Sequence, residues 1–326
     1  MTRHADTPQL ASLARNPMPN GAIVGYFAGD DGVRMRYARW DATRGPRRGT
    51  ACIFTGRGEA IEKYFETIAD LRRRGFAVAI HDWRGQGGSE RLLANPSKGH
   101  ISTFATYDAD LTRFMKDVVL PDCPPPFVGI GHSMGGNILL RQSVIPGLWF
   151  DRMVLSAPLL DVARDRLPMS PWLVRNIVAI AGLGPMGRLY VPGGSDVPFD
   201  IQPFEGNPFT SDPERFQRNR QLVEQRPELG IGSPTLGWLR AAYRSCRMIM
   251  KPEFGRRVCI PMLLVAAGQD RVVSSSAIET FGSRLKSGAK VAIAGANHEL
   301  LHERDEFRQR FWAAFDAYLG TRSIAA

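Results

Sequence analysis

The chain has 326 residues, of which 44% are hydrophobic and 23% are charged. This is the composition of a folded globular protein long enough for a large α/β domain with an insertion, and it excludes extended disorder. The net charge of +10 favours anionic partners, but the basic residues are scattered without aromatic interleaving, so we predict no nucleic-acid binding.

The predicted elements begin after a segment of 31 residues that we assign to an N-terminal tail. Val33, Met35 and Tyr37 then alternate with polar residues, which is typical of a half-exposed strand. Short apolar runs next alternate with amphipathic helical stretches; the runs are ACIFTG, FAVAIHD, FVGIGHS and DRMVLSAP. This alternation predicts an α/β fold with a mostly parallel central sheet flanked by helices.

The alternation stops near residue 160 and resumes near residue 258 with the strand VCIPMLLVAAGQD. A helix at 274–285, the strand AKVAIAG and a last helix at 303–319 follow. Insertions at the carboxyl edge of a sheet often form substrate-binding caps. We therefore divide the chain into four parts: a tail (1–31), the first part of an α/β core (32–159), a cap or lid (160–257) and the second part of the core (258–326).

The motif Gly131-His132-Ser133-Met134-Gly135 has the form G-x-S-x-G and joins a predicted strand to a predicted helix. A serine at so sharp a turn needs small residues two positions before and after it, because a Cβ there would collide with a neighbouring strand or helix. The helix that begins near Met134 directs free N–H groups toward the serine oxygen. We therefore predict that Ser133 is a catalytic nucleophile.

A serine hydroxyl needs a base that takes its proton, and the base needs a carboxylate that orients it. In a sheet of this type both groups follow the serine, on loops after later strands. Asp270 ends the run MLLVAAGQD and His298 ends VAIAGANH, so we predict Asp270 as the acid and His298 as the base. Asp82 precedes the serine and is expected to hold a loop, and Asp161 is a weaker alternative.

The oxyanion of an acyl-transfer reaction needs two aligned donors. We predict the backbone N–H of Met134, next to the nucleophile, and that of Arg57, in the loop after ACIFTG. This chemistry requires no metal and no organic cofactor.

Two further patterns suggest other sites. Residues 298–302 read H-E-x-x-H, the pattern of zinc proteases, which requires both histidines on one helical face. The first histidine instead follows a predicted strand end, so a zinc protease is the weaker interpretation. Residues 182–187 read G-x-G-x-x-G, but no strand leads into them. We expect neither a metal site nor a dinucleotide site.

The four cysteines show neither a CxxC pair nor the spacing of metal ligands. Cys52 and Cys259 lie in strand-like apolar runs, where a buried reduced thiol is usual. The N-terminus lacks the apolar core of a secretory signal, and no stretch is long and apolar enough to span a membrane. We expect a cytoplasmic protein, with peripheral contact at the inner face of the membrane as an alternative.

Taken together, these residues resemble the α/β-hydrolases of the lysophospholipase and monoacylglycerol lipase group, often filed with the serine aminopeptidase S33-like hydrolases. The resemblance covers residues 32–319 and rests on six motifs in order: FTGRGEAIEKY, FAVAIHDWRGQGGS, GHISTFATYDADL, GIGHSMGG, LLVAAGQDRVV and GANHELLHE. The loop TGRGEAIEKY is closer to bacterial lysophospholipase L2-like proteins than to monoacylglycerol lipases, whose loop begins with His-Gly. The resemblance implies an α/β-hydrolase fold with a helical cap and the roles given above for Ser133, Asp270, His298, Arg57 and Met134.

These observations favour a serine hydrolase that cleaves carboxylic esters through an acyl-enzyme, with a lipid or another small ester as substrate. The cap holds an apolar series with two arginines beside it: Trp172, Leu173, Ile177, Val178, Ile180, Arg175 and Arg188. This series either faces an anionic lipid surface or packs the cap onto the core. A short-chain esterase and an aminopeptidase-type amidase would use the same triad. A noncatalytic ligand-binding module and a zinc protease are the remaining alternatives, and the sequence assigns neither substrate-binding residues nor an oligomeric state.

Overall fold

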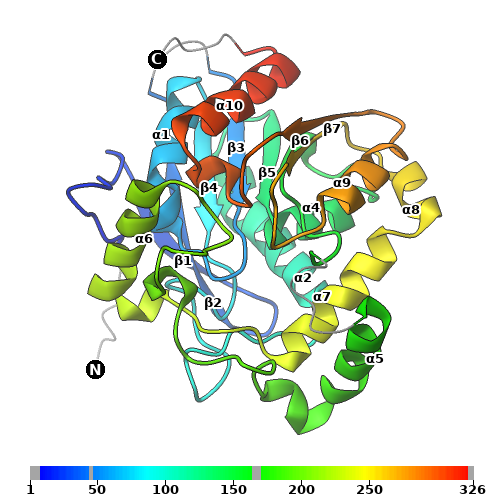
Figure 1. The fold of residues 1–326 in the computed structure, drawn as a ribbon. Helices are drawn as coiled ribbons and strands as arrows, with labels where there is room; N and C mark the ends of the chain where they lie inside the picture. Colours follow the sequence, from blue (N-terminus) through cyan, green and yellow to red (C-terminus); the bar gives the residue numbers. More distant parts are fainter. Residues whose placement is uncertain (1–7, 44–46, 164–169, 322–326) are drawn as a thin grey trace.

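The computed structural model describes residues 8–43, 47–163 and 170–321, and these form an eight-stranded sheet with helices on both faces (Figure 1). The strands are β1 (Ile23–Ala28), β2 (Arg34–Trp40), β3 (Thr50–Phe54), β4 (Ala77–His81), β5 (Phe127–His132), β6 (Phe150–Ser156), β7 (Met262–Ala267) and β8 (Gly288–Ile293). Their order in the sheet is β1-β2-β4-β3-β5-β6-β7-β8. The pairs β1–β2 and β2–β4 are antiparallel, and all the others are parallel. The predicted fold class is confirmed.

The helices are α1 (Phe65–Arg73), α2 (Ala105–Phe114), α3 (Leu120–Asp122), α4 (Met134–Gln142), α5 (Pro171–Ala181), α6 (Pro213–Gln225), α7 (Leu236–Ile249), α8 (Pro252–Arg257), α9 (Ser275–Gly282) and α10 (Asp305–Leu319). Side chains of α1 and α10 form one hydrophobic core against the sheet, and those of α2, α4 and α9 contribute to the core on the other face. Because helices cover both faces, β3, β4, β5 and β7 are buried along their whole length.

Two expectations from the sequence need correction. Residues 23–28, which we assigned to the tail, form the edge strand β1. Its alternation is weak because only Phe27 is fully buried, and residues 1–7 of the same tail lie outside the described residues. Cys259, expected to be buried, is exposed because it precedes β7, whereas Cys52 is buried within β3.

The segment between β6 and β7 contains α5, α6, α7 and α8, and we propose residues 160–257 as the cap, of which residues 164–169 lie outside the described residues. Its two sides contact different parts of the molecule. In Figure 1, α6 lies near α1 and the loop that precedes α10, whereas α5 lies on the other side, against α7. The two halves of the segment therefore have different supports.

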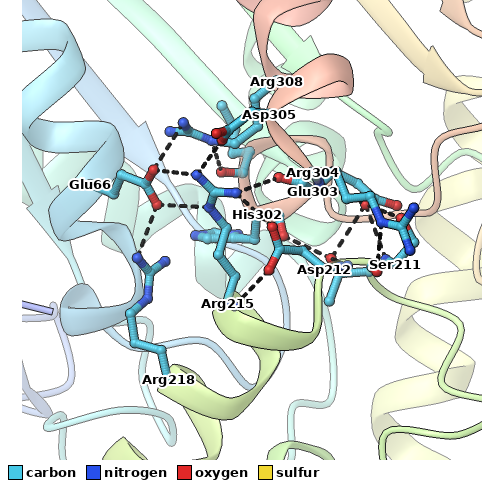
Figure 2. A network of polar contacts seen from close by, with 12 residues as sticks. Glu66, Ser211, Asp212, Arg215, Arg218, His302, Glu303, Arg304, Asp305 and Arg308 are labelled. Carbon is cyan, nitrogen blue, oxygen red and sulfur yellow. Dashed lines mark hydrogen bonds and ion pairs between the residues drawn. The ribbon is translucent and has the colours of Figure 1, made fainter. Parts of the chain in front are cut away.

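Arg215 on α6 lies between α1 and α10 in the network of Figure 2. Its Nη2 atom is 2.6 Å from Glu66 Oε1 on α1 and 2.7 Å from Asp305 Oδ1 at the start of α10. Arg218 and Arg308 contact the Glu66 carboxylate at 2.9 and 3.0 Å. Burial acts to raise the pKa of Glu66, but the three arginines outweigh burial and hold the pKa well below its ordinary value. Ion pairs therefore attach α6 to two elements of the core.

We expect Arg215→Met to lower the free energy of unfolding by about 2 kcal/mol at neutral pH, because Glu66 and Asp305 lose a shared, partly buried cation. Denaturant unfolding at several pH values measures this loss. The folded-state pKa of Glu66 is depressed, so its contribution is complete above about pH 5 and falls as the pH drops below the unfolded-state pKa. The difference between variant and wild type should therefore narrow below about pH 4.

Arg220→Met is the matched control, because Arg220 forms an exposed pair with Glu224 on the same helix. We expect a loss below about 0.5 kcal/mol from this variant. Equal losses in the two variants would contradict the role given to Arg215.

Candidate active site

Ser133 lies at the turn between β5 and α4, with backbone angles φ 49° and ψ −112°. Among the described residues, Ser133 and Ala157 alone combine a side chain with a positive φ. The surrounding structure holds this conformation, since the Ser133 N–H donates to the Ser156 carbonyl at 3.1 Å and the Ser133 carbonyl accepts from the Leu159 N–H at 2.9 Å. A non-glycine residue in so unfavourable a region is typical of a functional site.

The glycines around the serine make room for close packing, as predicted. A Cβ on Gly131 would lie 2.7 Å from the Cα of Gly136 in α4. A Cβ on Gly135 would lie 2.0 Å from the carbonyl oxygen of Phe54 at the end of β3. Both distances are far below van der Waals contact, so the turn can approach its two neighbours only with glycine at these positions.

Asp270 follows β7 and His298 follows β8, and the structure brings their side chains together. The Asp270 Oδ2 atom is 2.7 Å from Nδ1 of His298, and both side chains are almost completely buried. The other oxygen, Oδ1, accepts hydrogen bonds from the N–H groups of Val272 and Val273 at 2.8 and 2.9 Å. Burial acts to raise the pKa of Asp270, but His298 and these N–H groups outweigh it and lower the pKa. The carboxylate is thus kept ionised and fixed in direction.

Ser133 and His298 line one cavity of about 220 Å³. Arg57 and Met134 line the same cavity, and Asp270 reaches it through the imidazole of His298. The remaining wall is largely apolar and comes mostly from the proposed cap; it includes Leu159, Val162, Phe209, Trp238, Leu239, Ala242, Tyr243 and Cys246. Four of the predicted site residues therefore line one cavity, and the fifth, Asp270, contacts His298 in its wall.

The loop after β3 leaves one backbone donor unused. The Gly56 N–H donates to Glu59 Oε2 and the Gly58 N–H to Gln86 Oε1, both at 2.5 Å. Between them, the Arg57 N–H has no hydrogen-bond acceptor among the described residues. The Met134 N–H is also without an acceptor inside its helix, because Met134 is the first residue of α4. Two donors beside Ser133 therefore suit a developing oxyanion.

Sequence reasoning missed a buried charged cluster beneath this loop, formed by Glu59, Lys63 and Glu299. The Lys63 Nζ atom is 3.1 Å from Glu59 Oε1 and 2.7 Å from Glu299 Oε1. Glu59 also accepts a hydrogen bond from the Tyr64 hydroxyl at 2.6 Å. Burial acts to lower the pKa of Lys63, but the two carboxylates raise it above its ordinary value. The sequence held one usable signal for this cluster. Glu59 and Lys63 stand four positions apart in the motif TGRGEAIEKY, a spacing at which opposite charges can pair.

The H-E-x-x-H pattern does not form a zinc-protease helix. Within residues 298–302, only Leu300–His302 is helical, as a short 3₁₀ turn. His298 lies before this turn and directs its Nδ1 atom to Asp270. The Nε2–H of His302 donates to the Lys63 carbonyl at 3.0 Å. Glu59, Glu299 and His302 lie close enough to share an ion, but the ammonium group of Lys63 already lies between the two carboxylates and pairs with both. These residues therefore do not fit a zinc site.

The rival acids have other partners. Asp82 accepts hydrogen bonds from Arg36 Nε at 2.7 Å and from the Ile61 N–H at 2.9 Å, which confirms that it holds a loop. Asp161 pairs with Arg175 and not with His298. The glycines at 182–187 follow helix α5 instead of a strand, so they form no dinucleotide-binding turn.

The sequence matches a family model described as "Serine aminopeptidase, S33" over residues 45–305. Lysophospholipase L2 of Escherichia coli (strain K12) is 32% identical over 290 residues, which cover 86% of this chain and 83% of that protein. Monoacylglycerol lipase of Mycolicibacterium smegmatis is 24% identical over 290 residues, with coverage of 86% and 91%.

Solved structures show the same fold. A soluble variant of monoglyceride lipase from Saccharomyces cerevisiae, in complex with a substrate analog, aligns with a TM-score of 0.73 and 18% identity over 93% of this chain and 97% of that chain. A carboxyl esterase from Bacillus coagulans aligns with a TM-score of 0.70 and 20% identity over 93% and 99%. Both therefore agree with the α/β-hydrolase fold that the sequence predicted.

We expect Gly135→Ala to destabilise the protein by more than about 3 kcal/mol, because the new Cβ would overlap the backbone of Phe54, which cannot move without displacing β3. Gly129→Ala is the control, since its Cβ would meet side-chain atoms and no backbone, with Leu139 at 3.3 Å and Phe150 at 3.4 Å, and about 1 kcal/mol should be lost. Thermal unfolding of the purified variants measures both. A tolerant Gly135→Ala variant would disprove the crowding argument.

Proposed function

The chain belongs to the serine aminopeptidase S33 family of α/β-hydrolases, and from this premise we propose that it is a serine hydrolase that cleaves carboxylic esters of single-chain lipids. One observation carries the proposal: Ser133 and His298 share a cavity, and Asp270 binds the imidazole nitrogen. Relatives named as a lysophospholipase and a monoacylglycerol lipase support a lipid ester as the substrate.

In the proposed mechanism, His298 Nε2 takes the proton of the Ser133 hydroxyl as Oγ attacks the ester carbonyl carbon. Asp270 accepts a hydrogen bond from the Nδ1–H of His298. It therefore selects the tautomer whose Nε2 carries no proton, and it stabilises the imidazolium that forms. The N–H groups of Arg57 and Met134 donate to the oxyanion. The imidazolium then protonates the leaving alcohol, and a water molecule activated by the same base hydrolyses the acyl-enzyme.

The apolar walls of the site favour an acyl chain over a short acid. The catalytic cavity adjoins a further cavity of about 470 Å³ between α5 and α7, and Tyr243 and Cys246 line both. We place the acyl chain along the apolar walls of the catalytic cavity and the apolar part of the larger one, which Asp161 and four arginines also line. A short-chain esterase or an aminopeptidase-type amidase would use the same triad, and a panel of esters and aminoacyl amides of increasing length separates the three activities.

The surface of α5 and the following turn supports contact with a lipid surface. Exposed apolar side chains gather there: Trp172, Leu173, Ile177, Ile180, Leu183, Met186 and Leu189. Val178 on the same helix is buried, so cap packing explains that residue but not the others. Arg188 is exposed beside them, and the chain carries a net charge of +10. We therefore propose a peripheral contact with anionic lipids; within the described residues, no helix is long and apolar enough to cross a bilayer.

A fluorophosphonate should label the protein at Ser133 alone, because among the serine and threonine hydroxyl groups that the structure describes only that of Ser133 shares a cavity with the proposed base and oxyanion donors. We expect Ser133→Ala to abolish labelling and to lower kcat by about 10⁴-fold or more with an acyl ester. Peptide mass mapping and an esterase assay measure the two effects.

Ser276→Ala, at an exposed serine on α9, is the control and should keep both labelling and turnover. Chelators should leave the activity intact. Labelling at another residue, or full turnover in Ser133→Ala, would refute the mechanism.

We expect Ile180→Asp to lower partitioning onto vesicles that contain phosphatidylglycerol by about tenfold, because a carboxylate replaces an apolar side chain that is 75% exposed. Co-sedimentation measures the partitioning, which should also weaken at high salt. Ile145→Asp is the control, since Ile145 is 45% exposed on another face. Equal loss in both variants would speak against a specific surface.

A further inference from the structure

Another cavity, of about 630 Å³, also adjoins the catalytic cavity and has a polar lining. We call it the polar cavity. It lies between the loop after β3 and two stretches of the proposed cap, 197–209 and 231–234. Arg57, Glu59, Phe209, Pro234 and Glu299 line both cavities, so a substrate held at Ser133 can extend from one into the other.

Arg57 brings an unpaired positive charge to the junction of the two cavities. Its Nη2 donates to the Gly232 carbonyl at 2.9 Å, and its guanidinium lies 5.3 Å from the ring centroid of Trp238. The Nε atom is buried without a partner, and no carboxylate among the described residues forms an ion pair with this side chain. Burial lowers the pKa of Arg57 to about 10, so the group is still charged at neutral pH. A buried cation of this kind is suited to an anionic ligand.

Asp200 brings an opposite charge to the far part of the polar cavity. It belongs to the 3₁₀ turn Phe199–Ile201 and lines the polar cavity but not the catalytic one. Its carboxylate is half-buried and takes part in no ion pair found among the described residues. Burial raises its pKa, and the attraction of Lys63, which acts in the opposite direction, does not outweigh burial.

The other charged groups of this cavity are already satisfied or hydrated. Lys63 pairs with both Glu59 and Glu299, and burial raises the pKa of Glu299, which reduces the negative charge of this cluster. Arg271 donates to the carbonyls of Gly206 and Asn207. Glu205 is exposed to solvent. The cavity therefore offers one cation beside the catalytic serine and one anion further away.

We propose that this cavity binds the zwitterionic head group of a lysophospholipid, with the phosphodiester on Arg57 and the cationic amine on Asp200. The proposal rests on the ester hydrolysis proposed above and makes its substrate specific. In such a lipid the phosphate follows the scissile ester and the amine follows the phosphate, which matches the order of Ser133, Arg57 and Asp200 from one cavity into the next. A monoglyceride has neither charge and would leave Arg57 and Asp200 without partners.

The test compares kcat/KM for three substrates that share one short acyl chain and stay monomeric: a lysophosphatidylethanolamine, a lysophosphatidylglycerol and a monoglyceride. Arg57→Met should lower kcat/KM for the two phosphodiesters by about tenfold more than for the monoglyceride, because only they lose a charge-assisted bond. Arg57→Lys should recover part of this ratio. Equal losses for all three substrates would overturn the assignment of Arg57.

Asp200→Asn should lower kcat/KM for the ethanolamine lipid about fivefold relative to the phosphoglycerol lipid, which has no amine. An unchanged ratio would overturn the amine part of the proposal. Arg152→Met is the matched control, because Arg152 also donates to a backbone carbonyl, that of Tyr318, and lies 5.3 Å from an aromatic ring centroid, but lines neither the catalytic cavity nor the two cavities beside it. Its substrate ratios should equal those of the wild type, and thermal unfolding verifies that every variant is folded.

Inhibition distinguishes a lipid head group from free phosphate. Glycerophosphoethanolamine should inhibit monoglyceride hydrolysis more strongly than inorganic phosphate does, and Arg57→Met should weaken this inhibition. Equal inhibition by the two compounds would assign Arg57 to free phosphate and overturn the head-group proposal. If the wild type hydrolyses no ester and Ser133 is not labelled, the proposed function itself fails; turnover with unaltered substrate ratios rejects only the head-group site.

Discussion

The close approach of α4 to the ends of β3 and β6 is the constraint on which the rest of the site depends. At Ser133 the chain leaves β5 and enters α4 in one residue, so the backbone adopts a positive φ. The positions two residues before and after Ser133 accept only glycine, because a Cβ there would collide with neighbouring backbone. This crowding has a chemical consequence. It places the first N–H groups of α4 and the loop after β3 in the same cavity as the Ser133 hydroxyl, where they suit the oxyanion of the proposed acyl transfer. Residues far apart in the sequence thus meet because strands β3, β5, β7 and β8 all end at this edge.

The loop that carries the proposed second oxyanion donor, the Arg57 N–H, is supported by a cluster of buried charges. Glu59 accepts hydrogen bonds from Gly56 and Tyr64 and pairs with Lys63, and Lys63 in turn pairs with Glu299, next to His298. A buried ion pair contributes little net stability, because desolvation offsets the attraction. Its contribution here is geometric, because one cluster contacts both the loop that carries the Arg57 N–H and the loop that carries His298, the proposed base. Removing one of these charged side chains would leave an unpaired buried charge next to both loops.

Much of the fold and of the candidate site follows from local pattern. The parallel strands were predictable because strands buried on both faces are continuous apolar runs, and the serine turn because its glycines have one physical reason to stand there. The edge strand β1 was not, since one buried residue leaves no periodicity to detect. The Glu59–Lys63–Glu299 cluster escaped prediction for a different reason: Glu299 lies 236 positions from Lys63, and its local context resembles a zinc motif. Pairings of this kind depend on tertiary structure alone.

The proposed cap and the core make different contributions to the proposed site, and they meet at Arg57. The groups assigned to bond cleavage lie on the core, after the strands, and depend on sheet geometry that solved structures below 25% identity still share. The apolar wall over the serine and most of the polar cavity come instead from the segment between β6 and β7. Ion pairs attach α6, whose Phe216 contacts Phe199 in the wall of the polar cavity, to α1 and α10, whereas α5 turns apolar side chains outward. The part of the cap that ion pairs attach to the core suits recognition of charges at fixed positions. The part with outward apolar side chains suits entry of an acyl chain from a lipid surface, so one insertion can serve both ends of an amphipathic substrate.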